Sequence, residues 1–168
     1  MPDARILVVY FSRSGTTRRL AKSLAERLNA DIEEICDYRN RSGPGGYLRS
    51  LIQAIRQRPA EIVPHELDVA SYDLVIIGTP VWAGSVSTPV RAYLAENSPY
   101  FRHVAFFCCL GGRGSESAFS QMRALAAMPP LAELKVSAGD LKRGEENRLI
   151  HGFVDKVMHK LTEISTRE

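Results

Sequence analysis

The sequence contains no apolar run that approaches the roughly 18–20 residues needed for a membrane-spanning helix. Asp3 and Arg5 lead directly into an apolar stretch, which is not the arrangement of a signal peptide. Only three cysteines are present, Cys36, Cys108 and Cys109, which is too few for a disulfide framework and suits a reducing compartment. From these absences we expect a cytoplasmic protein with no segment inserted into a membrane.

Motifs for metal ions and nucleic acids are also missing. The sequence has no C-x-x-C, and its four histidines are scattered rather than set at the spacing of metal ligands. The formal net charge of +3 is weak, and no stretch interleaves aromatic with basic residues. We therefore expect neither a metal centre nor a nucleic-acid partner.

The remaining composition is that of an ordinary globular protein. Hydrophobic residues make up 45% and charged residues 24% of the 168 positions, which argues against disorder. A chain of this length suits one domain with a full hydrophobic core. Because no linker long enough to mark a boundary interrupts it, residues 1–168 are predicted to form a single domain.

Short apolar runs alternate with amphipathic helical patterns along the chain. Five stretches have the composition of strands, namely residues 6–10, 32–36, 72–78, 104–109 and 131–136. A helical pattern follows each of them, and in the first helix Leu20, Leu24 and Leu28 recur at helical spacing. This order predicts an α/β fold, a three-layer doubly wound domain whose five-stranded parallel sheet is covered on both faces.

Loops of unusual composition follow the first, third and fourth predicted strands, at residues 12–17, 79–84 and 110–115. Sheets of this kind bind ligands outside the carboxyl ends of their strands, where the strand order reverses. In the order 2-1-3-4-5 these three strands are neighbours in the middle of the sheet. Their loops are therefore expected to converge on one crevice.

The residue types in these loops indicate a ligand. Residues 12–17 form a hydroxyl-rich turn before a helix N-terminus, where backbone N–H groups and the helix dipole attract phosphate. Hydroxyl residues also cap many helices, so this turn alone is a weak signal. Trp82 offers an aromatic surface, and Gly111, Gly112 and Gly114 let the backbone approach a flat ligand. Phosphate at one end and a planar ring at the other describe a mononucleotide, flavin mononucleotide (FMN) in particular.

The first loop resembles the phosphate-binding loop of the flavodoxin family. Four residues match its hydroxyl-x-hydroxyl-Gly-x-Thr signature, namely Ser12, Ser14, Gly15 and Thr17. The pattern of elements is similar over essentially the whole chain, with a moderate match at residues 78–82 and a loose one in the third loop. The resemblance implies a flavodoxin-like sheet, non-covalently bound FMN and a role in electron transfer.

On this resemblance the cofactor-binding residues fall into three groups. The phosphate group would contact Ser12, Arg13, Ser14, Gly15, Thr16 and Thr17. The ring would be flanked on one side by Thr79, Pro80, Val81, Trp82, Ala83 and Gly84, and on the other by Cys109, Leu110, Gly111, Gly112, Gly114 and Ser115. No catalytic residue is assigned.

The sequence departs from the family in its charges. Flavodoxins are usually acidic around the flavin, whereas neither residues 79–88 nor residues 109–115 contain an acid. The aromatic residue that commonly stacks on the ring from the third loop is also missing. Acids beside a flavin disfavour its anionic reduced form, and neutral loops do not. We therefore expect FMN bound here to be reduced at a less negative potential than in an acidic flavodoxin.

Residues 37–58 are strongly basic. They hold a single acid and five arginines, Arg39, Arg41, Arg49, Arg56 and Arg58. Two interpretations remain open: a solvated helix over residues 47–55 with a basic loop, or an electropositive rim beside the phosphate site. A basic surface also suggests partners other than the positively charged reductases that acidic carriers meet.

Two redox functions remain open. The chain would pass electrons between a reductase and a partner protein or small-molecule acceptor, or it would be an FMN-dependent NAD(P)H:quinone-type oxidoreductase. Turnover of NAD(P)H with a quinone separates them. A flavin-free interaction module is a further alternative, and the oligomeric state is undetermined.

Other classes with related folds fit less well. The third strand ends in Gly78 and Thr79 rather than the acceptor Asp of a receiver domain. Neither the dinucleotide motif G-x-G-x-x-G nor the hydrolase motif G-x-S-x-G occurs. Cys108 and Arg113 are one residue too close for a cysteine phosphatase.

Overall fold

The computed structural model describes residues 4–37, 62 and 65–168. The helix predicted over residues 47–55 and the five arginines of the basic segment lie outside the described residues. None of the described helices is long and apolar enough to cross a membrane.

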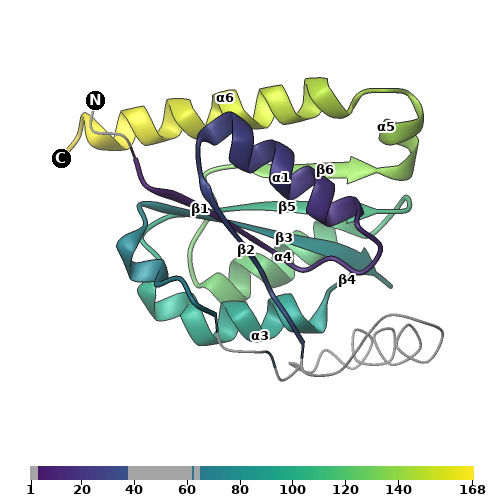
Figure 1. The fold of residues 1–168 in the computed structure, drawn as a ribbon, viewed down its shortest axis with the longest axis horizontal. Helices are drawn as coiled ribbons and strands as arrows, with labels where there is room; N and C mark the ends of the chain where they lie inside the picture. The colour runs from purple at the N-terminus through teal and green to yellow at the C-terminus, as the bar shows by residue number, and fades with distance from the viewer. Residues whose placement is uncertain (1–3, 38–61, 63–64) are drawn as a thin grey trace.

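A parallel sheet forms the middle layer of the molecule (Figure 1). Its parallel strands are β1 (Ile6–Tyr10), β2 (Asp31–Glu34), β3 (Leu74–Trp82), β5 (Val104–Leu110) and β6 (Glu133–Ser137). They pair in the order β2-β1-β3-β5-β6, which is the predicted order 2-1-3-4-5 when only parallel strands are counted. The prediction of a doubly wound α/β fold is confirmed.

Helices cover both faces of this sheet (Figure 1). One face carries α1 (Thr16–Leu28) and α6 (Glu146–Ser165), and the other carries α3 (Thr88–Asn97) and α4 (Ser115–Ala126). Further short elements among the described residues include α5 (Ala138–Lys142) and the 3-10 turns Val69–Ser71 and Ser98–Tyr100. Each face of the sheet therefore contributes to its own hydrophobic core.

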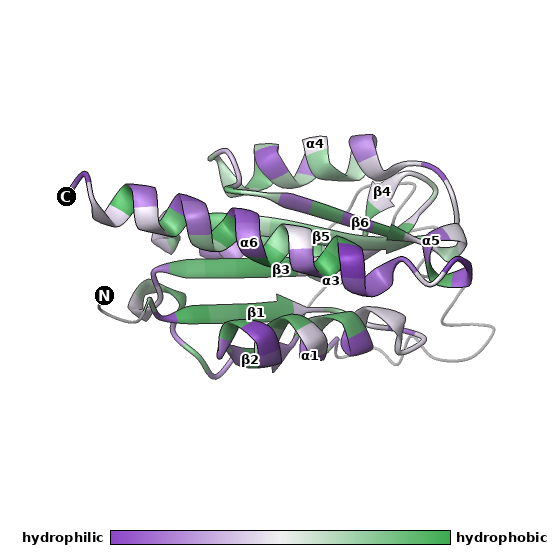
Figure 2. Cartoon of the chain, turned by 90° about the horizontal axis from the view of Figure 1, so that it is seen from above, coloured by the Kyte–Doolittle hydropathy of each residue, from purple (hydrophilic) through white to green (hydrophobic). Residues whose placement is uncertain are grey.

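The central strands are buried because both of their faces are covered. All five residues of β1 are buried; Leu7 packs in the core under α3 and α4, and Val8 in the core under α1 and α6. Figure 2 shows β1 and β3 apolar along their length. The edge strand β2 is partly exposed, in agreement with its weaker apolar pattern.

The third predicted strand continues beyond its expected end at Gly78. Residues 79–84 were predicted to form a loop, but β3 runs to Trp82 and turns back into a short antiparallel strand, β4 (Ser85–Val86). The turn residues Ala83 and Gly84 have φ angles of 51° and 70°, as a tight two-residue hairpin requires. The loop prediction is therefore wrong for residues 79–82, because pairing with β4 and β5 keeps them extended.

Candidate functional site

The carboxyl ends of β1, β3, β5 and β6 meet around a cavity of about 270 Å³. Half of the sequence-predicted site residues line it, namely Ser14, Thr16, Thr17, Pro80, Val81, Trp82, Cys109, Leu110 and Gly111. Three further lining residues come from the end of β6 and from α5, namely Val136, Ala138 and Leu141. We call this the carboxyl-edge cavity. Its position is the crevice expected for a sheet of this strand order.

The loop after β1 presents hydroxyl groups at the start of α1. Gly15 takes a φ of 99°, which a glycine adopts without strain, and its N–H donates to Ser12 Oγ at 3.0 Å. Thr17 lies in the first turn and is only 2% exposed. The first N–H groups of a helix have no acceptor within it, and no acid occupies this turn of α1. The loop therefore offers hydrogen-bond donors to an anion, and no acidic side chain in the first turn of α1 would repel that anion.

Ser12, Arg13 and Gly15 belong to this loop but do not line the cavity. Ser12 is 8% exposed, and its hydroxyl oxygen is the acceptor that closes the turn. These residues shape the loop, whereas Ser14, Thr16 and Thr17 face the cavity.

The hairpin of β3 and β4 places Trp82 at the cavity. The indole ring meets Phe11 edge to face, with ring centroids 6.2 Å apart and an interplanar angle of 89°. Thr79 is completely buried; its hydroxyl accepts from the Ser87 N–H at 3.1 Å and donates to the Pro80 carbonyl at 2.7 Å. Thr79 therefore supports the hairpin from behind instead of facing the cavity.

The hairpin is also held from α4. Gln121 donates to the Gly84 carbonyl at 3.4 Å and accepts from the Val86 N–H at 3.3 Å. Its side-chain oxygen also accepts a hydrogen bond from the buried guanidinium of Arg91. Burial lowers the pKa of Arg91, and within the described residues its guanidinium hydrogen-bonds to Gln121. One glutamine thus ties the turn of the hairpin to two helices.

The third loop packs against the hairpin through two glycines. Gly114 is the N-cap residue of α4, with a φ of 102°, and a Cβ there would lie 2.7 Å from Gly84 Cα. Gly114, Ala83, Gly84 and Ser115 do not line the cavity, and neither does the exposed Gly112. Close contact of the two loops therefore explains Gly114 better than direct contact with a ligand.

Sequence reasoning missed the residues that follow β6. Ser137 and Asp140 form a capping box: the Asp140 N–H donates to Ser137 Oγ at 3.1 Å, and the Ser137 N–H donates to Asp140 Oδ2 at 2.9 Å. The two hydrogen bonds with Ser137 lower the pKa of Asp140. The S-x-x-D spacing was the available signal for α5, which brings Ala138 and Leu141 to the cavity.

None of the described residues that line this cavity carries a charge. Burial raises the pKa of Cys109 to about 11, against the smaller opposing effect of a hydrogen bond with Thr17, so this thiol is protonated at neutral pH. The negative charge of Glu146 also raises the pKa of Cys109, but Glu146 forms a salt bridge with Arg19 at 3.2 Å. The cavity is therefore close to electrically neutral.

These observations fit a mononucleotide cofactor. The hydroxyls and the helix N-terminus suit a phosphate group, and Pro80, Trp82 and Leu110 provide an uncharged surface for a planar ring. Among the described residues no cluster of three or more His, Cys, Asp or Glu side chains is arranged to hold a metal ion.

Comparison with known proteins supports the fold. No protein-family model matches the sequence, and no curated protein gives a significant match. Among solved structures, a flavoprotein from Lactobacillus acidophilus NCFM in complex with FMN is 23% identical, with a TM-score of 0.70 over 83% of this chain and 97% of that one.

Two further structures are similar over a larger share of this chain. A WrbA-like flavodoxin from Agrobacterium tumefaciens is 18% identical, with a TM-score of 0.53 over 91% of this chain and 99% of that one. A flavodoxin from the domain Archaea is 18% identical, with a TM-score of 0.52 over 92% and 99%. The chain has the flavodoxin-like fold.

Proposed function

We propose that the chain binds FMN non-covalently in the carboxyl-edge cavity and acts as an electron-transfer flavoprotein. The observation that carries this proposal is the convergence of the loop after β1 with the carboxyl-terminal ends of β3 and β5 on one neutral cavity. A structure with this fold, the Lactobacillus flavoprotein, contains FMN. Bound FMN supplies the redox chemistry by accepting and returning electrons.

In this proposal the two ends of the cavity hold different parts of the cofactor. Ser14, Thr16 and Thr17 donate hydrogen bonds to the phosphate, and the N-terminus of α1 adds its N–H groups and its dipole. Trp82 and Leu110 flank the ring and exclude water from it. The chain places no charged side chain at this part of the described cavity, so the ring's potential is expected to be less negative than in an acidic flavodoxin.

Reconstitution with FMN tests the proposal. We expect the purified protein to retain a yellow flavin through ultrafiltration and to release FMN on denaturation. Titration should give a much weaker affinity for riboflavin, which has the same ring but no phosphate. The proposal fails if FMN does not bind, and the phosphate assignment fails if riboflavin binds equally well.

An FMN-dependent NAD(P)H:quinone-type oxidoreductase is the alternative at the same cavity. Steady-state assays of the FMN-loaded protein with NADH or NADPH and a quinone separate the two functions. A pure electron carrier accepts electrons from a reductase but does not oxidise NAD(P)H itself. Sustained NAD(P)H oxidation would instead make the chain an enzyme.

A further inference from the structure

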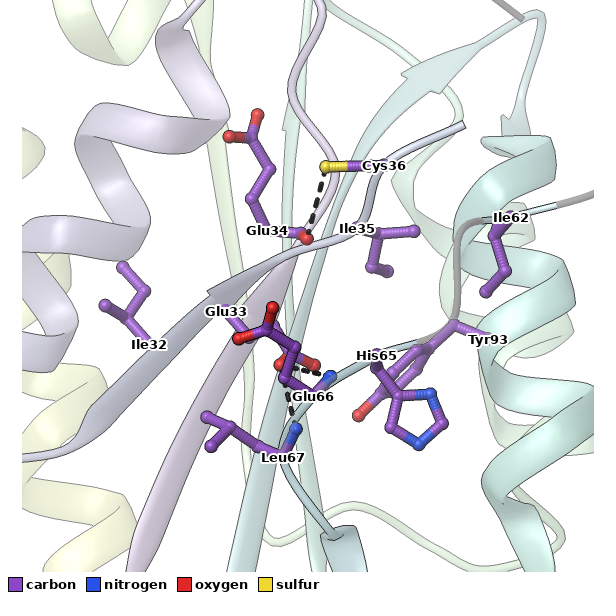
Figure 3. Close-up of a pocket in the computed structure, with 10 residues that line it drawn as sticks. All are labelled: Ile32, Glu33, Glu34, Ile35, Cys36, Ile62, His65, Glu66, Leu67 and Tyr93. Atoms are coloured by element: carbon purple, nitrogen blue, oxygen red, sulfur yellow. Dashed lines mark hydrogen bonds between the residues drawn. The ribbon is translucent and has the colours of Figure 1, made fainter. Parts of the chain in front are cut away.

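A second and larger cavity, of about 470 Å³, lies beside the edge strand β2 (Figure 3). It shares no described residue with the carboxyl-edge cavity. Its apolar lining includes Ile35, Ile62 and Leu67, and the first two belong to the core under α3 and α4. We call it the β2 cavity. Its volume lies within the roughly 300–1,000 Å³ of small-molecule sites.

Unpartnered polar atoms concentrate at this cavity. In the described part of the chain four buried side-chain nitrogen or oxygen atoms have no hydrogen-bond partner. Three of them belong to residues that line the β2 cavity: Glu33 Oε1, His65 Nδ1 and Tyr93 Oη. Buried polar atoms are normally hydrogen-bonded, because leaving one unpaired is costly. Their gathering in one cavity points to a polar group that is bound there.

These atoms are held in place by their surroundings (Figure 3). Glu33 Oε2 accepts hydrogen bonds from the N–H groups of Glu66 and Leu67, both at 3.0 Å. These bonds fix the carboxylate and leave Oε1 without a hydrogen-bond partner among the described residues. The Tyr93 side chain is 0% exposed, and its ring packs against His65 with centroids 5.5 Å apart. A site built in this way needs little rearrangement to accept a ligand.

The charge of the described lining favours one kind of ligand. Three carboxylates line it, from Glu33, Glu34 and Glu66, and none of its described lining residues is a lysine or an arginine. Glu34 is paired with Arg18 at 2.5 Å, whereas Glu33 and Glu66 have no salt bridge within the described residues. This acidic surface stands out in a chain whose net charge is +3.

The hydrogen-bonding character of the three atoms agrees with that charge. A carboxylate oxygen and a phenol oxygen can accept a hydrogen bond, and so can an imidazole nitrogen that carries no proton. They therefore match a ligand with several N–H donors, and the aliphatic lining matches an apolar body. We propose that the β2 cavity binds a small organic cation, an amidinium, guanidinium or ammonium group on an apolar body. This site is separate from the proposed FMN site and does not depend on it.

Isothermal titration of the full chain with benzamidine tests the proposal, with benzamide as the uncharged probe of the same shape. Glu33→Gln removes the charge, and Tyr93→Phe removes only the unpartnered hydroxyl. Glu163→Gln is the matched control, since Glu163 is an exposed acid on α6 that pairs with His159. Circular dichroism checks that each variant is folded. If Glu33→Gln does not fold, the benzamidine affinity of Tyr93→Phe alone tests the proposal.

We expect benzamidine to bind one-to-one, with or without FMN, and benzamide to bind about tenfold more weakly or worse. Glu33→Gln should weaken benzamidine about tenfold and Tyr93→Phe about fivefold, with no change in Glu163→Gln. The proposal is overturned if benzamidine fails to bind at about 10 mM, a concentration at which even weak sites fill. Equal affinity for benzamide, or an unchanged affinity in both cavity variants, also overturns it.

Discussion

The two cavities of this protein are built from different chemistry. The carboxyl-edge cavity is lined by hydroxyls, backbone and apolar side chains, and its described lining carries no charge. The β2 cavity is lined by three carboxylates and contains polar atoms with no partner. The first lies where parallel sheets place their ligand sites, and the second lies beside an edge strand. A neutral cavity at a helix N-terminus suits an anion, whereas an acidic cavity suits a cation.

The comparison shows that the position of a cavity and the charge of the ligand that suits it are determined by different features of the chain. Flavodoxin-like topology determines where the first cavity lies, and the absence of acids in its loops determines its neutrality. The described lining of the β2 cavity comes from residues 32–36, from Ile62, from residues 65–67 and from Tyr93 of α3. Variants that affect one cavity should therefore leave the other unchanged.

Gly114→Ala should produce the largest effect, and only at the carboxyl-edge cavity. The new Cβ would lie 2.7 Å from Gly84 Cα at a φ of 102°, so we expect a loss of about 2–3 kcal/mol in the free energy of unfolding. Urea denaturation measures this loss, and titration should show weaker FMN binding with an unchanged affinity for benzamidine. The matched control is Gly112→Ala, where a Cβ would meet nothing within 4 Å. Equal destabilisation by both variants would contradict the packing argument.

Thr17→Val should weaken FMN binding while leaving the β2 cavity unaffected. The substitution keeps the shape of a side chain that is 2% exposed and removes only its hydroxyl. Loss of a hydrogen bond to a charged phosphate should cost about 1.5 kcal/mol or more, roughly tenfold in Kd. Ser14→Ala should act in the same direction. Fluorescence titration measures both, and an unchanged FMN affinity in the two variants would disprove the phosphate site.

Asp140→Ala should cost about 1 kcal/mol in the free energy of unfolding, because it removes the capping box of α5. The pKa of Asp140 is lowered below 3.8, so its stabilising effect is present above that pH and disappears as pH falls through the lowered value. Urea denaturation of both proteins at pH 7 and at progressively lower pH should show their difference shrinking. A difference that does not depend on pH would contradict a role for the carboxylate. FMN should also bind more weakly, since α5 carries Ala138 and Leu141.

Tyr93→Phe should have the smallest effect on stability, within about 0.5 kcal/mol, because the hydroxyl it removes has no partner. Tyr72→Phe is the matched control, since the Tyr72 hydroxyl donates to Asp31 at 2.7 Å, and its loss should cost about 1 kcal/mol. Chemical denaturation measures the free energy of unfolding of both variants. Equal costs would mean that the Tyr93 hydroxyl is stabilised within the protein, which would weaken the case for a ligand site there.

Much of the fold could be predicted from local patterns. β1 and β5 are runs of apolar residues, and the stripe of α1 buries Leu20 and Leu24 as their spacing requires. The strand order also needed the resemblance carried by the loop at residues 12–17. The hairpin after Gly78 was missed because a proline and a glycine near Trp82 are typical of a loop, whereas pairing with β4 and β5 makes this segment extended.

The sequence by itself determined the alternation of strands and helices, the hydroxyl-rich turn at residues 12–17 and the lack of acids in the next two loops. These depend on residue type and on spacing within a few positions. Only the tertiary structure decided which hydroxyls face the cavity, that α5 contributes to its lining, and that Gly84 and Gly114 must touch. It alone also brought Glu33, His65 and Tyr93 together. Contacts between segments so far apart in the chain depend on how the sheet and its helices pack, which no local pattern specifies.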